Sequence, residues 1–398
     1  MYKRQSFDTA LILDGRPQVK HEGSIEGWPV QTSWVDVVSI GAGGGSIARA
    51  DEGLLRVGPG SAGAAPGPAC YDNGGTEPTV TDAALLLGML GDGALSQGLR
   101  LDEHAARRAI EPLAVELSLS LEDTARGVIA VTASAMAEAI REITIGQGED
   151  PREARLIAFG GAGPLFGGLL AAELDLPEVI VPPYAGNFSA WGLLGQDVTH
   201  EAARTIFGVL DSRLIEELNE ALAVMFDDLD TRHGDDTGDL ERIVGLDLRY
   251  VGQEHALNVR VPSSTGRVAK ADLEPVAATF ADDYERRFGT NLTEDLELVT
   301  VRATVRRRLG GDPGTSALGG ERTGVERAPS FSAFSFTQNE RVEFAVCERA
   351  DLEPGAPVAG PMIVFEPTAT TYVDSGFTVT VTESSTLSIV RRGKGGSA

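Results

Sequence analysis

The chain has few cysteines and few basic residues, and each shortage excludes a class of protein. Only Cys70 and Cys347 occur in 398 residues, too few for a disulfide framework or a cysteine-rich metal site. Lys and Arg number 34 against 59 Asp and Glu, which gives a formal net charge of -25. Nucleic-acid binding depends on clustered basic side chains that release counterions, so this charge argues against a nucleic-acid partner.

Long apolar runs are also missing. No stretch approaches the ~20 uncharged residues that a membrane-spanning helix needs, and the first residues do not have the pattern of a signal peptide. The scarcity of cysteine fits a reducing compartment. The sequence therefore predicts a cytoplasmic protein without a membrane anchor.

Histidine and cysteine form no recognisable catalytic or metal centre. The five histidines lack metal-ligand spacing, and neither a Gly-x-Ser-x-Gly elbow nor a P-loop occurs. His255, beside Gln253 and Glu254, is interpreted as a structural histidine in preference to a catalytic one. Cys70 lies among small residues, where an inert, partly buried thiol is a simpler interpretation than a nucleophile. Triad or zinc chemistry is not expected.

Glycine, in contrast, is abundant. It supplies 48 residues, well above the ~7% of average usage, and concentrates at Gly41 to Gly98 and Gly160 to Gly195. The chain length and the 42% apolar content favour two or three globular domains. Glycine thins out after about Ala202, which predicts a domain boundary near Asp197 to Thr205.

The most informative stretch is Leu156 to Leu165, an apolar run that breaks into glycines and continues as a helical pattern to Leu174. Glycines between a strand and a helix let a ligand approach backbone amides, because no Cβ blocks them and the helix N-terminus is partly positive. Close packing of a helix on a sheet requires the same residues. The stretch alone leaves both interpretations open.

The surrounding sequence predicts further strands and loops. Asp14-Gly15 and Asp51-Glu52-Gly53 each separate apolar segments and predict two β-hairpins. Val35 to Ile40 predicts a buried strand that enters Gly41 to Ser46, whose three consecutive glycines indicate positive φ or close approach by another group. Val57 to Tyr71 has no helical or strand period and predicts a long functional loop.

Helices are predicted on both sides of the glycine stretch. Thr81 or Asp82 is expected to cap a helix that continues to Gly88, and Asp82 is either that cap or a carboxylate of a ligand site. Helical periodicity also covers Asp102 to Leu117 and Ser120 to Ile145, and Ser120 to Asp123 is a capping signature. A strand at Glu178 to Pro182 then completes an α/β layer with its ligand face at the carboxyl ends of the strands.

The second half of the chain has another pattern. Alternating runs at Gly245 to Val251 and Ala256 to Val261 predict two strands, and a helix is expected at Glu274 to Phe288. Leu296 to Leu309 is strand-like, with its arginines expected to mark exposed edges. Arg341 to Val390 predicts an all-β module. The remaining expectations are a linker at Gly310 to Arg327 and a disordered tail at 392–398.

Six motifs in their order along the chain resemble the hydantoinase A / oxoprolinase family, from about Ser6 to Ile389. They are Gly41-Ala-Gly-Gly-Gly-Ser-Ile47, Val57-Gly-Pro-Gly-Ser-Ala-Gly63, Pro66-Gly-Pro-Ala-Cys-Tyr71, Gly74-Gly-Thr-Glu-Pro-Thr-Val-Thr-Asp-Ala83, Phe159-Gly-Gly-Ala-Gly-Pro164 and Arg249-Tyr-Val-Gly-Gln-Glu-His255. The resemblance implies an α/β fold with a partial actin-like ATPase lobe (1–200), then an α+β region (201–310), an all-β carboxyl-terminal module (328–391) and the tail (392–398).

The resemblance also implies site residues. Gly160, Gly161, Ala162 and Gly163 resemble the adenosine motif of actin-like ATPases, and Gly43, Gly44, Gly45 and Ser46 match nucleotide-binding positions near the interface of the two lobes. Asp8 and Asp82 are the predicted catalytic carboxylates, and no metal ligand is assigned. Family members carry an Asp-x-Gly-Gly-Thr phosphate loop where this chain has Met1 to Gln5. We therefore expect the phosphate-binding lobe to be lost or supplied by another polypeptide.

In function, the resemblance implies part of an ATP-dependent hydrolase of cyclic amides such as hydantoin, N-methylhydantoin or oxoproline. ATP and Mg²⁺ are the expected cofactors, and a hydantoinase B-type subunit and an amino-terminal lobe are the expected partners in an oligomer. One alternative is the ATP-binding subunit of an acetone- or acetophenone-type carboxylase. Another is a non-catalytic nucleotide-binding or assembly module, which the missing phosphate loop favours.

Overall fold

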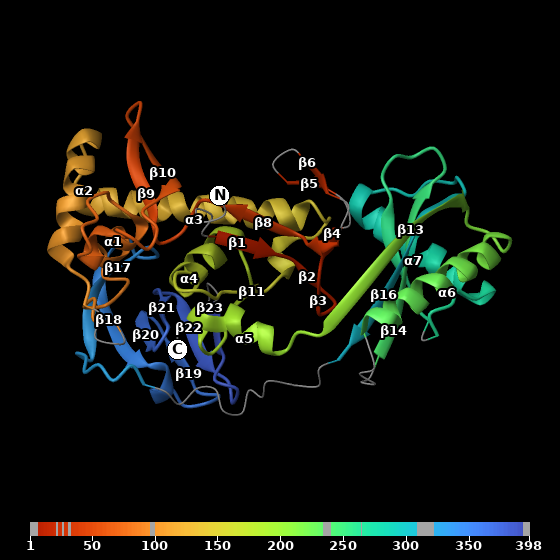
Figure 1. Cartoon of the computed structure of the whole chain (residues 1–398). Helices are drawn as coiled ribbons and strands as arrows, with labels where there is room; N and C mark the ends of the chain where they lie inside the picture. The colour runs from red at the N-terminus through yellow and green to blue at the C-terminus, as the bar shows by residue number, and fades with distance from the viewer. Residues whose placement is uncertain are drawn as a thin grey trace. The chain divides into compact units, whose positions relative to one another are not determined.

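The computed structural model describes residues 7–20, 23–25, 28–30, 33–95, 100–233, 240–263, 265–308 and 322–392. The chain forms two compact units, one made of Met1–Ala190 with Gly314–Ala398 and the other of Trp191–Pro313 (Figure 1). The expectations for Met1 to Gln5, for 310–321 of the predicted linker and for 393–398 of the tail lie outside the described residues.

The first unit contains most of the strands. Its first part has β1 (Phe7–Ala10), β2 (Ile12–Leu13), β3 (Arg16–Pro17), β4 (Val19–Lys20), β5 (Gly23–Ile25), β6 (Trp28–Val30), β7 (Trp34–Val35), β8 (Val37–Ile40), β9 (Ser46–Asp51), β10 (Leu54–Ser61), β11 (Leu156–Ile157) and β12 (Glu178–Val181). Its last part has β17 (Ser330–Ser335), β18 (Glu340–Glu348), β19 (Pro357–Ala359), β20 (Met362–Glu366), β21 (Ala369–Val373), β22 (Phe377–Val381) and β23 (Leu387–Arg391). Its helices are α1 (Val80–Leu86), α2 (Glu103–Leu117), α3 (Leu121–Ile145) and α4 (Gly163–Leu174), and α5 (Phe188–Leu194) follows.

Both predicted hairpins are confirmed. β2 pairs with β3 and β9 pairs with β10, each antiparallel. Their turns place Asp14 and Gly15, and Glu52 and Gly53, at positive φ. That conformation suits the two central residues of the tight turns that match strand twist. Contrary to expectation, the loop predicted from Val57 begins as strand, because β10 continues to Ser61.

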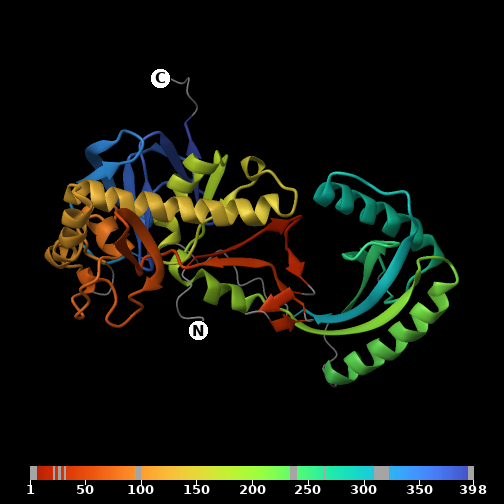
Figure 2. The same cartoon turned by 90° about the horizontal axis from the view of Figure 1, so that it is seen from above.

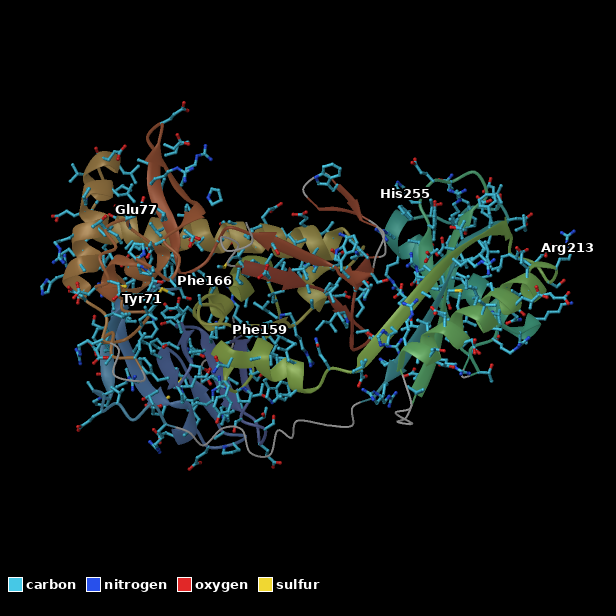
Figure 3. The ribbon with its side chains drawn as sticks, in the orientation of Figure 1. Tyr71, Glu77, Phe159, Phe166, Arg213 and His255 are labelled. Carbon is cyan, nitrogen blue, oxygen red and sulfur yellow. The ribbon has the colours of Figure 1, made fainter. Side chains whose placement is uncertain are left out.

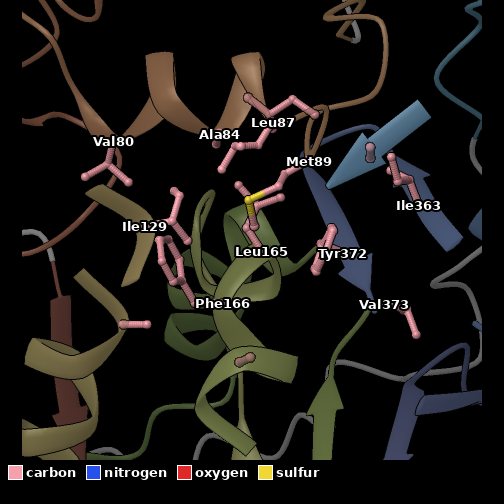
Figure 4. Packing of buried hydrophobic residues seen from close by; sticks show 14 of the residues in the cluster. Val80, Ala84, Leu87, Met89, Ile129, Leu165, Phe166, Ile363, Tyr372 and Val373 are labelled. Carbon is pink, nitrogen blue, oxygen red and sulfur yellow. The ribbon is translucent and has the colours of Figure 1, made fainter. Parts of the chain in front are cut away.

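The predicted helices α2 and α3 are also confirmed, with Asp102 and Ser120 as their N-caps. The Ser120 Oγ accepts from the Asp123 N–H at 3.0 Å, as the capping signature predicted. Helix α3, which Figure 2 shows along its length, buries one apolar face. Figure 4 shows that core where α1 and α4 meet the strands, with Val80, Ala84, Leu87, Met89, Ile129, Leu165, Phe166, Ile363, Tyr372 and Val373 labelled.

A mixed sheet joins distant parts of the chain. β11 and β12 pair in parallel through α4, as predicted. On its other edge β12 pairs antiparallel with β23, which gives the order β11-β12-β23-β22-β19. Residues 328–391, expected as a separate module, are therefore rich in strands but share a sheet and a hydrophobic core with the first unit. β17-β18-β20-β21 form a second sheet of the same unit.

The second unit is an antiparallel sheet with helices on one face. Its strands are β13 (Val198–Val209), β14 (Leu240–Tyr250), β15 (Leu257–Val261) and β16 (Leu296–Arg307), in the order β13-β16-β14-β15, and its helices are α6 (Leu214–His233) and α7 (Leu273–Phe288). Apolar side chains of both helices bury one face of the sheet. The two strands predicted around Gly252 to His255 are confirmed. Among the described residues, no helix has the length and apolar character to span a membrane.

The prediction that the arginines of 296–309 mark exposed edges is wrong. β16 lies between β13 and β14, and the side chain of Arg302 is only 12% exposed. The Arg302 Nε donates to Asp247 Oδ2 at 2.9 Å, and Arg306 Nε donates to Glu241 Oε2 at 3.1 Å. Arginine occurs at these positions because carboxylates of the neighbouring strand pair with it across the polar face.

Hydrogen bonds from Arg306 are the main cause that lowers the pKa of Glu241 from its ordinary 4.5 to about 2. A carboxylate with a lowered folded-state pKa stabilises the fold above its unfolded pKa and loses that contribution as pH falls. We expect Glu241→Gln to lower the free energy of unfolding at pH 7, with an effect that shrinks as pH falls from 4.5 toward about 2. Urea unfolding at several pH values measures this, with exposed Glu216→Gln as control. A constant difference across pH would contradict the prediction.

Candidate functional site

The glycine stretch forms a sharp turn between β11 and α4. The Ala158 N–H donates to Ile180 O at 2.8 Å and extends the pairing with β12. Gly160 has φ +83°, a conformation that favours glycine, and its N–H donates to Ala185 O at 2.7 Å. The turn ends at Ala162, the N-cap of α4, whose methyl side chain has no atom to cap the helix.

The structure separates the two roles that the sequence left open for these glycines. A Cβ at Gly167 would lie 2.8 Å from Val179 Cγ1, so this glycine serves the packing of α4 on β12. A Cβ at Gly160 or Gly161 would meet no atom within 4 Å. Gly161 is exposed, and the backbone there is open to a ligand beside the N-terminus of α4. Packing therefore accounts for Gly167 and the positive φ for Gly160, whose N–H is already bonded to Ala185 O, and Gly161 has open space beside its backbone.

The loop at Gly43 to Ser46 is fixed by its serine. The Gly43 N–H donates to Ser46 Oγ at 3.0 Å, and this hydroxyl donates to Gly41 O at 3.1 Å. Ser46 is 1% exposed. Its hydroxyl therefore holds the loop from within, and Ser46 has little surface for direct contact with a nucleotide.

The two predicted glycine loops approach each other at Gly44 and Ala162. The Gly44 carbonyl accepts from the Thr81 N–H at 2.9 Å and from Thr81 Oγ1 at 2.8 Å. A Cβ on Gly44 would lie 2.8 Å from that hydroxyl and 4.0 Å from Ala162 Cβ. On the next residue, a Cβ at Gly45 would lie 3.0 Å from Ser61 Oγ. Three segments of small residues thus meet beside the start of α4.

Asp82 occupies a buried position under these loops. Thr79 is the N-cap of α1, so the cap predicted at Thr81 or Asp82 is wrong by two or three residues. Asp82 Oδ1 accepts from the Cys70 N–H at 2.7 Å, and Oδ2 accepts from the N–H and the hydroxyl of Thr79 at 2.9 and 2.7 Å and from the Ala69 N–H at 3.3 Å. The side chain is 0% exposed and joins the loop before α1 to the helix. Its catalytic role stays a prediction.

Asp8 has a different environment. It is exposed on β1, opposite Ser39 of β8, and accepts a hydrogen bond from the Ser39 hydroxyl. β8 leads directly into the loop that begins at Gly41. Asp8 therefore lies near the strand end that enters the glycine loop, with carboxylate surface open to solvent. Its catalytic role also stays a prediction.

Cys70 and His255 differ in exposure. Burial, followed by the nearby Asp82 carboxylate, raises the pKa of Cys70 far above its ordinary value, so the thiol stays protonated and unreactive at neutral pH. The residue is fully buried, beyond the partial burial that the sequence suggested, and this supports the interpretation of Cys70 as an inert thiol. His255 is exposed in the second unit, between β14 and β15 (Figure 3).

Among the described residues, the glycine loops contain no cluster of metal ligands, and the cavity found in the first unit lies elsewhere. In the part of the chain that the structure describes, no group of three His, Cys, Asp or Glu is arranged to hold a metal ion. A cavity of about 550 Å³ is lined by Arg141, Ile145, Glu149, Glu173 and Asp175, among others. It lies at the C-terminal end of α4, about 18 Å along this 12-residue helix from Gly163.

The sequence predicted a loop and helix from Ala185 to Leu194, but not which groups support the glycine turn. They are the segment Tyr184 to Asn187, whose carbonyl at Ala185 holds Gly160, and Glu366, whose carboxylate holds the Ala185 N–H. Phe159 (Figure 3) also contacts Phe188 there, with ring centroids 5.3 Å apart. One signal was available, since Glu366 ends the apolar run that starts at Met362.

Replacing Asp82 tests its structural role. In Asp82→Ala the N–H groups of Ala69, Cys70 and Thr79 lose a buried acceptor, so we expect the free energy of unfolding to fall by about 3 kcal/mol or more. In the control, Asp51→Ala removes an exposed carboxylate paired with Arg56, and should cost less than about 1 kcal/mol. Urea unfolding compares the two, and equal losses would contradict the structural role.

Comparison with known proteins gives one consistent result. Residues 5–202 match the hydantoinase/oxoprolinase family. The chain is 33% identical over 403 residues to the caprolactamase subunit alpha of Pseudomonas jessenii, covering 96% of this chain and 56% of that protein. It is 32% identical over 298 residues to the acetophenone carboxylase gamma subunit of Aromatoleum aromaticum, covering 71% of this chain and 40% of that protein.

The solved structure of the ATP-dependent caprolactamase from Pseudomonas jessenii has the same fold. It superposes with a TM-score of 0.82 at 32% identity, covering 98% of this chain and 57% of that one. The chain thus spans about half the length of these relatives. The ordered motifs, the meeting of the glycine loops and these matches agree, and the chain belongs to the hydantoinase/oxoprolinase family.

Proposed function

We propose that this chain is the nucleotide-binding part of an ATP-dependent enzyme that hydrolyses cyclic amides. The observation that carries the proposal is the open backbone at Gly160 and Gly161, beside Gly44 and the N-terminus of α4. The ATP-dependent caprolactamase from Pseudomonas jessenii, whose name specifies both ATP and a lactam, has the same fold. The finer assignment of residues 1–200 to a partial actin-like ATPase lobe is part of the proposal.

The residues fit a nucleotide better than they fit a metal ion. Backbone amides at the start of α4 suit an anionic or polar ligand, and glycine permits its close approach. Asp82 is enclosed by protein donors, whereas Asp8 has exposed carboxylate oxygens. Since no cluster of metal ligands occurs among the described residues, Mg²⁺ stays an expectation from the resemblance, and we assign no step to it.

The chemistry explains why a cyclic-amide hydrolase needs ATP. Amide resonance makes the ring carbonyl a poor electrophile for water. Bound ATP supplies the phosphoryl group that converts the amide oxygen into a leaving group. The role of this chain in that reaction is to bind and orient the nucleotide through Gly160 to Gly163, with Asp8 as the accessible carboxylate. We place the reaction in the cytoplasm.

Partners follow from the same proposal. The names of two relatives include a subunit letter, and this chain has about half of their length. We propose that it works with a hydantoinase B-type subunit and with an amino-terminal lobe that supplies the phosphate loop, in an oligomer. The similarity to a carboxylase subunit supports a second candidate function, in which ATP activates bicarbonate or a ketone.

Substrate-dependent ATP turnover separates the candidates. We expect the assembly of this chain with its proposed partners to hydrolyse ATP faster when caprolactam, oxoproline or hydantoin is added. Faster turnover with acetone or acetophenone plus bicarbonate would favour the carboxylase. ATP binding without turnover under any of these conditions would favour the non-catalytic module and contradict the enzyme.

Gly161→Val tests the open backbone. A Cβ at Gly161 meets no atom within 4 Å, so the variant should fold with unchanged thermal stability. The new side chain would occupy the space that the nucleotide needs, and we expect the Kd for ATP to rise at least ~10-fold by calorimetry. Ala135→Val, on the exposed surface of α3, is the control and should bind as the wild type does. Unchanged affinity in Gly161→Val would remove this turn from the binding site.

A further inference from the structure

Ala185, in the turn before α5, connects the glycine turn to the last part of the chain by two hydrogen bonds. The Gly160 N–H donates to Ala185 O at 2.7 Å, and the Ala185 N–H donates to Glu366 Oε1 at 3.3 Å. Glu366 is the last residue of β20. Two hydrogen bonds through one residue therefore connect the candidate nucleotide site to a strand some two hundred residues later.

Glu366 is itself fixed by a buried arginine. Glu366 Oε2 lies 3.0 Å from Arg349 Nε, and the two side chains are 5% and 4% exposed. Arg349 Nη1 also donates to Val181 O at 3.2 Å and to Ser385 O at 2.8 Å. The guanidinium is thus held at the end of β12 and at the connection between β22 and β23, and it faces the carboxylate as an ion pair in which its Nε makes no hydrogen bond.

The conformation of the supported turn needs such support. Tyr184 has φ 51°, an uncommon conformation for a residue with a large side chain. A Cβ at Gly186 would lie 2.1 Å from Thr368 O, so the turn sits directly on the connection between β20 and β21. Glu366 accepts a hydrogen bond from this turn, and Thr368 packs against it. These two contacts stabilise the positive φ of Tyr184, which a residue with a large side chain disfavours.

A buried ion pair is a poor device for stability alone. Removing two charges from water costs about as much as their attraction returns, and an apolar pair of similar size is often as stable. Burial is the main cause that raises the pKa of Glu366 and lowers that of Arg349. The pair is better explained by the geometry that it imposes on Ala185.

We propose that Glu366 and Arg349 are positioning residues of the nucleotide site, which fix Ala185 and through it the Gly160 backbone against the bound nucleotide. The proposal rests on the proposed nucleotide binding at Gly160 to Gly163. It extends the site to residues of the last part of the chain, from which the sequence predicted no nucleotide-binding residue. Neither residue needs to touch the nucleotide.

The test replaces the pair by an apolar pair, Arg349→Met with Glu366→Leu, in the full chain. The double variant leaves no unpaired buried charge and is expected to fold, with a circular dichroism spectrum like that of the wild type. Its Kd for ATP, measured by calorimetry, should rise about 10-fold. A second variant, Arg349→Met with Glu366→Gln, also leaves no unpaired buried charge, keeps an oxygen that can accept from the Ala185 N–H, and should recover part of the affinity.

A matched control is available in the second unit. Arg302 and Asp247 form another largely buried pair, with Arg302 Nε 2.9 Å from Asp247 Oδ2 and both side chains 12% exposed. Arg302→Met with Asp247→Leu removes a comparable pair from the other unit and should leave the Kd for ATP unchanged. Equal Kd values for the wild type and the Arg349–Glu366 double variant would overturn the proposal, as would equal weakening by the control.

Amide hydrogen exchange keeps this proposal separate from the proposed function. In the Arg349–Glu366 variant without nucleotide, exchange in residues 158–163 should accelerate about 10-fold, while α3 keeps its protection. Exchange that is unchanged at 158–163, or faster throughout the unit, would refute the positioning role even if ATP binds. Failure of the wild type to bind ATP while the local acceleration occurs would refute the proposed function alone.

Discussion

Backbone pairing on both edges of β12 is the constraint on which the first unit depends. On one edge β12 pairs in parallel with β11, and on the other it pairs antiparallel with β23. The first pairing places the glycine turn at the carboxyl end of β11, beside α4. The second joins the last strand of the chain to the same sheet. A single four-residue strand therefore determines which residues surround the candidate site.

Residues around the candidate site fall into two groups: polar side chains that hold the loops in shape, and glycines that leave their backbone open. Ser46, Thr81 and Asp82 are engaged with backbone groups of the loops and are largely enclosed. Gly160 and Gly161 contribute bare backbone with open space above it. Such a division suits a site that binds through its main chain, because loops of small residues keep their shape only when neighbouring polar groups hold them.

The sequence predicted local features well and long-range pairing poorly. Asp14-Gly15 and the Ser120 cap determine their own geometry within a few residues, so hairpin and helix followed directly from the pattern. The family resemblance named both glycine loops as nucleotide-binding segments but did not predict that Gly44 and Ala162 approach each other. The sharing of a sheet by β12 and β23 has no local signal, because alternation predicts a strand but not its partner. For the same reason the arginines of β16 were assigned to an edge and Glu366 was overlooked.

The interrupted course of the first unit has a consequence for biosynthesis. Its strands β12 and β23 are separated by the complete second unit, which the ribosome produces in between. Until β20 has emerged Ala185 lacks Glu366, and until β23 has emerged one edge of β12 lacks its partner. The second unit is one continuous segment, Trp191–Pro313, so all of its strands are available for folding before β17 is synthesised. Assembly of the glycine turn is therefore a late event in synthesis, and the exposed strand edge is the point where a nascent chain needs protection from aggregation.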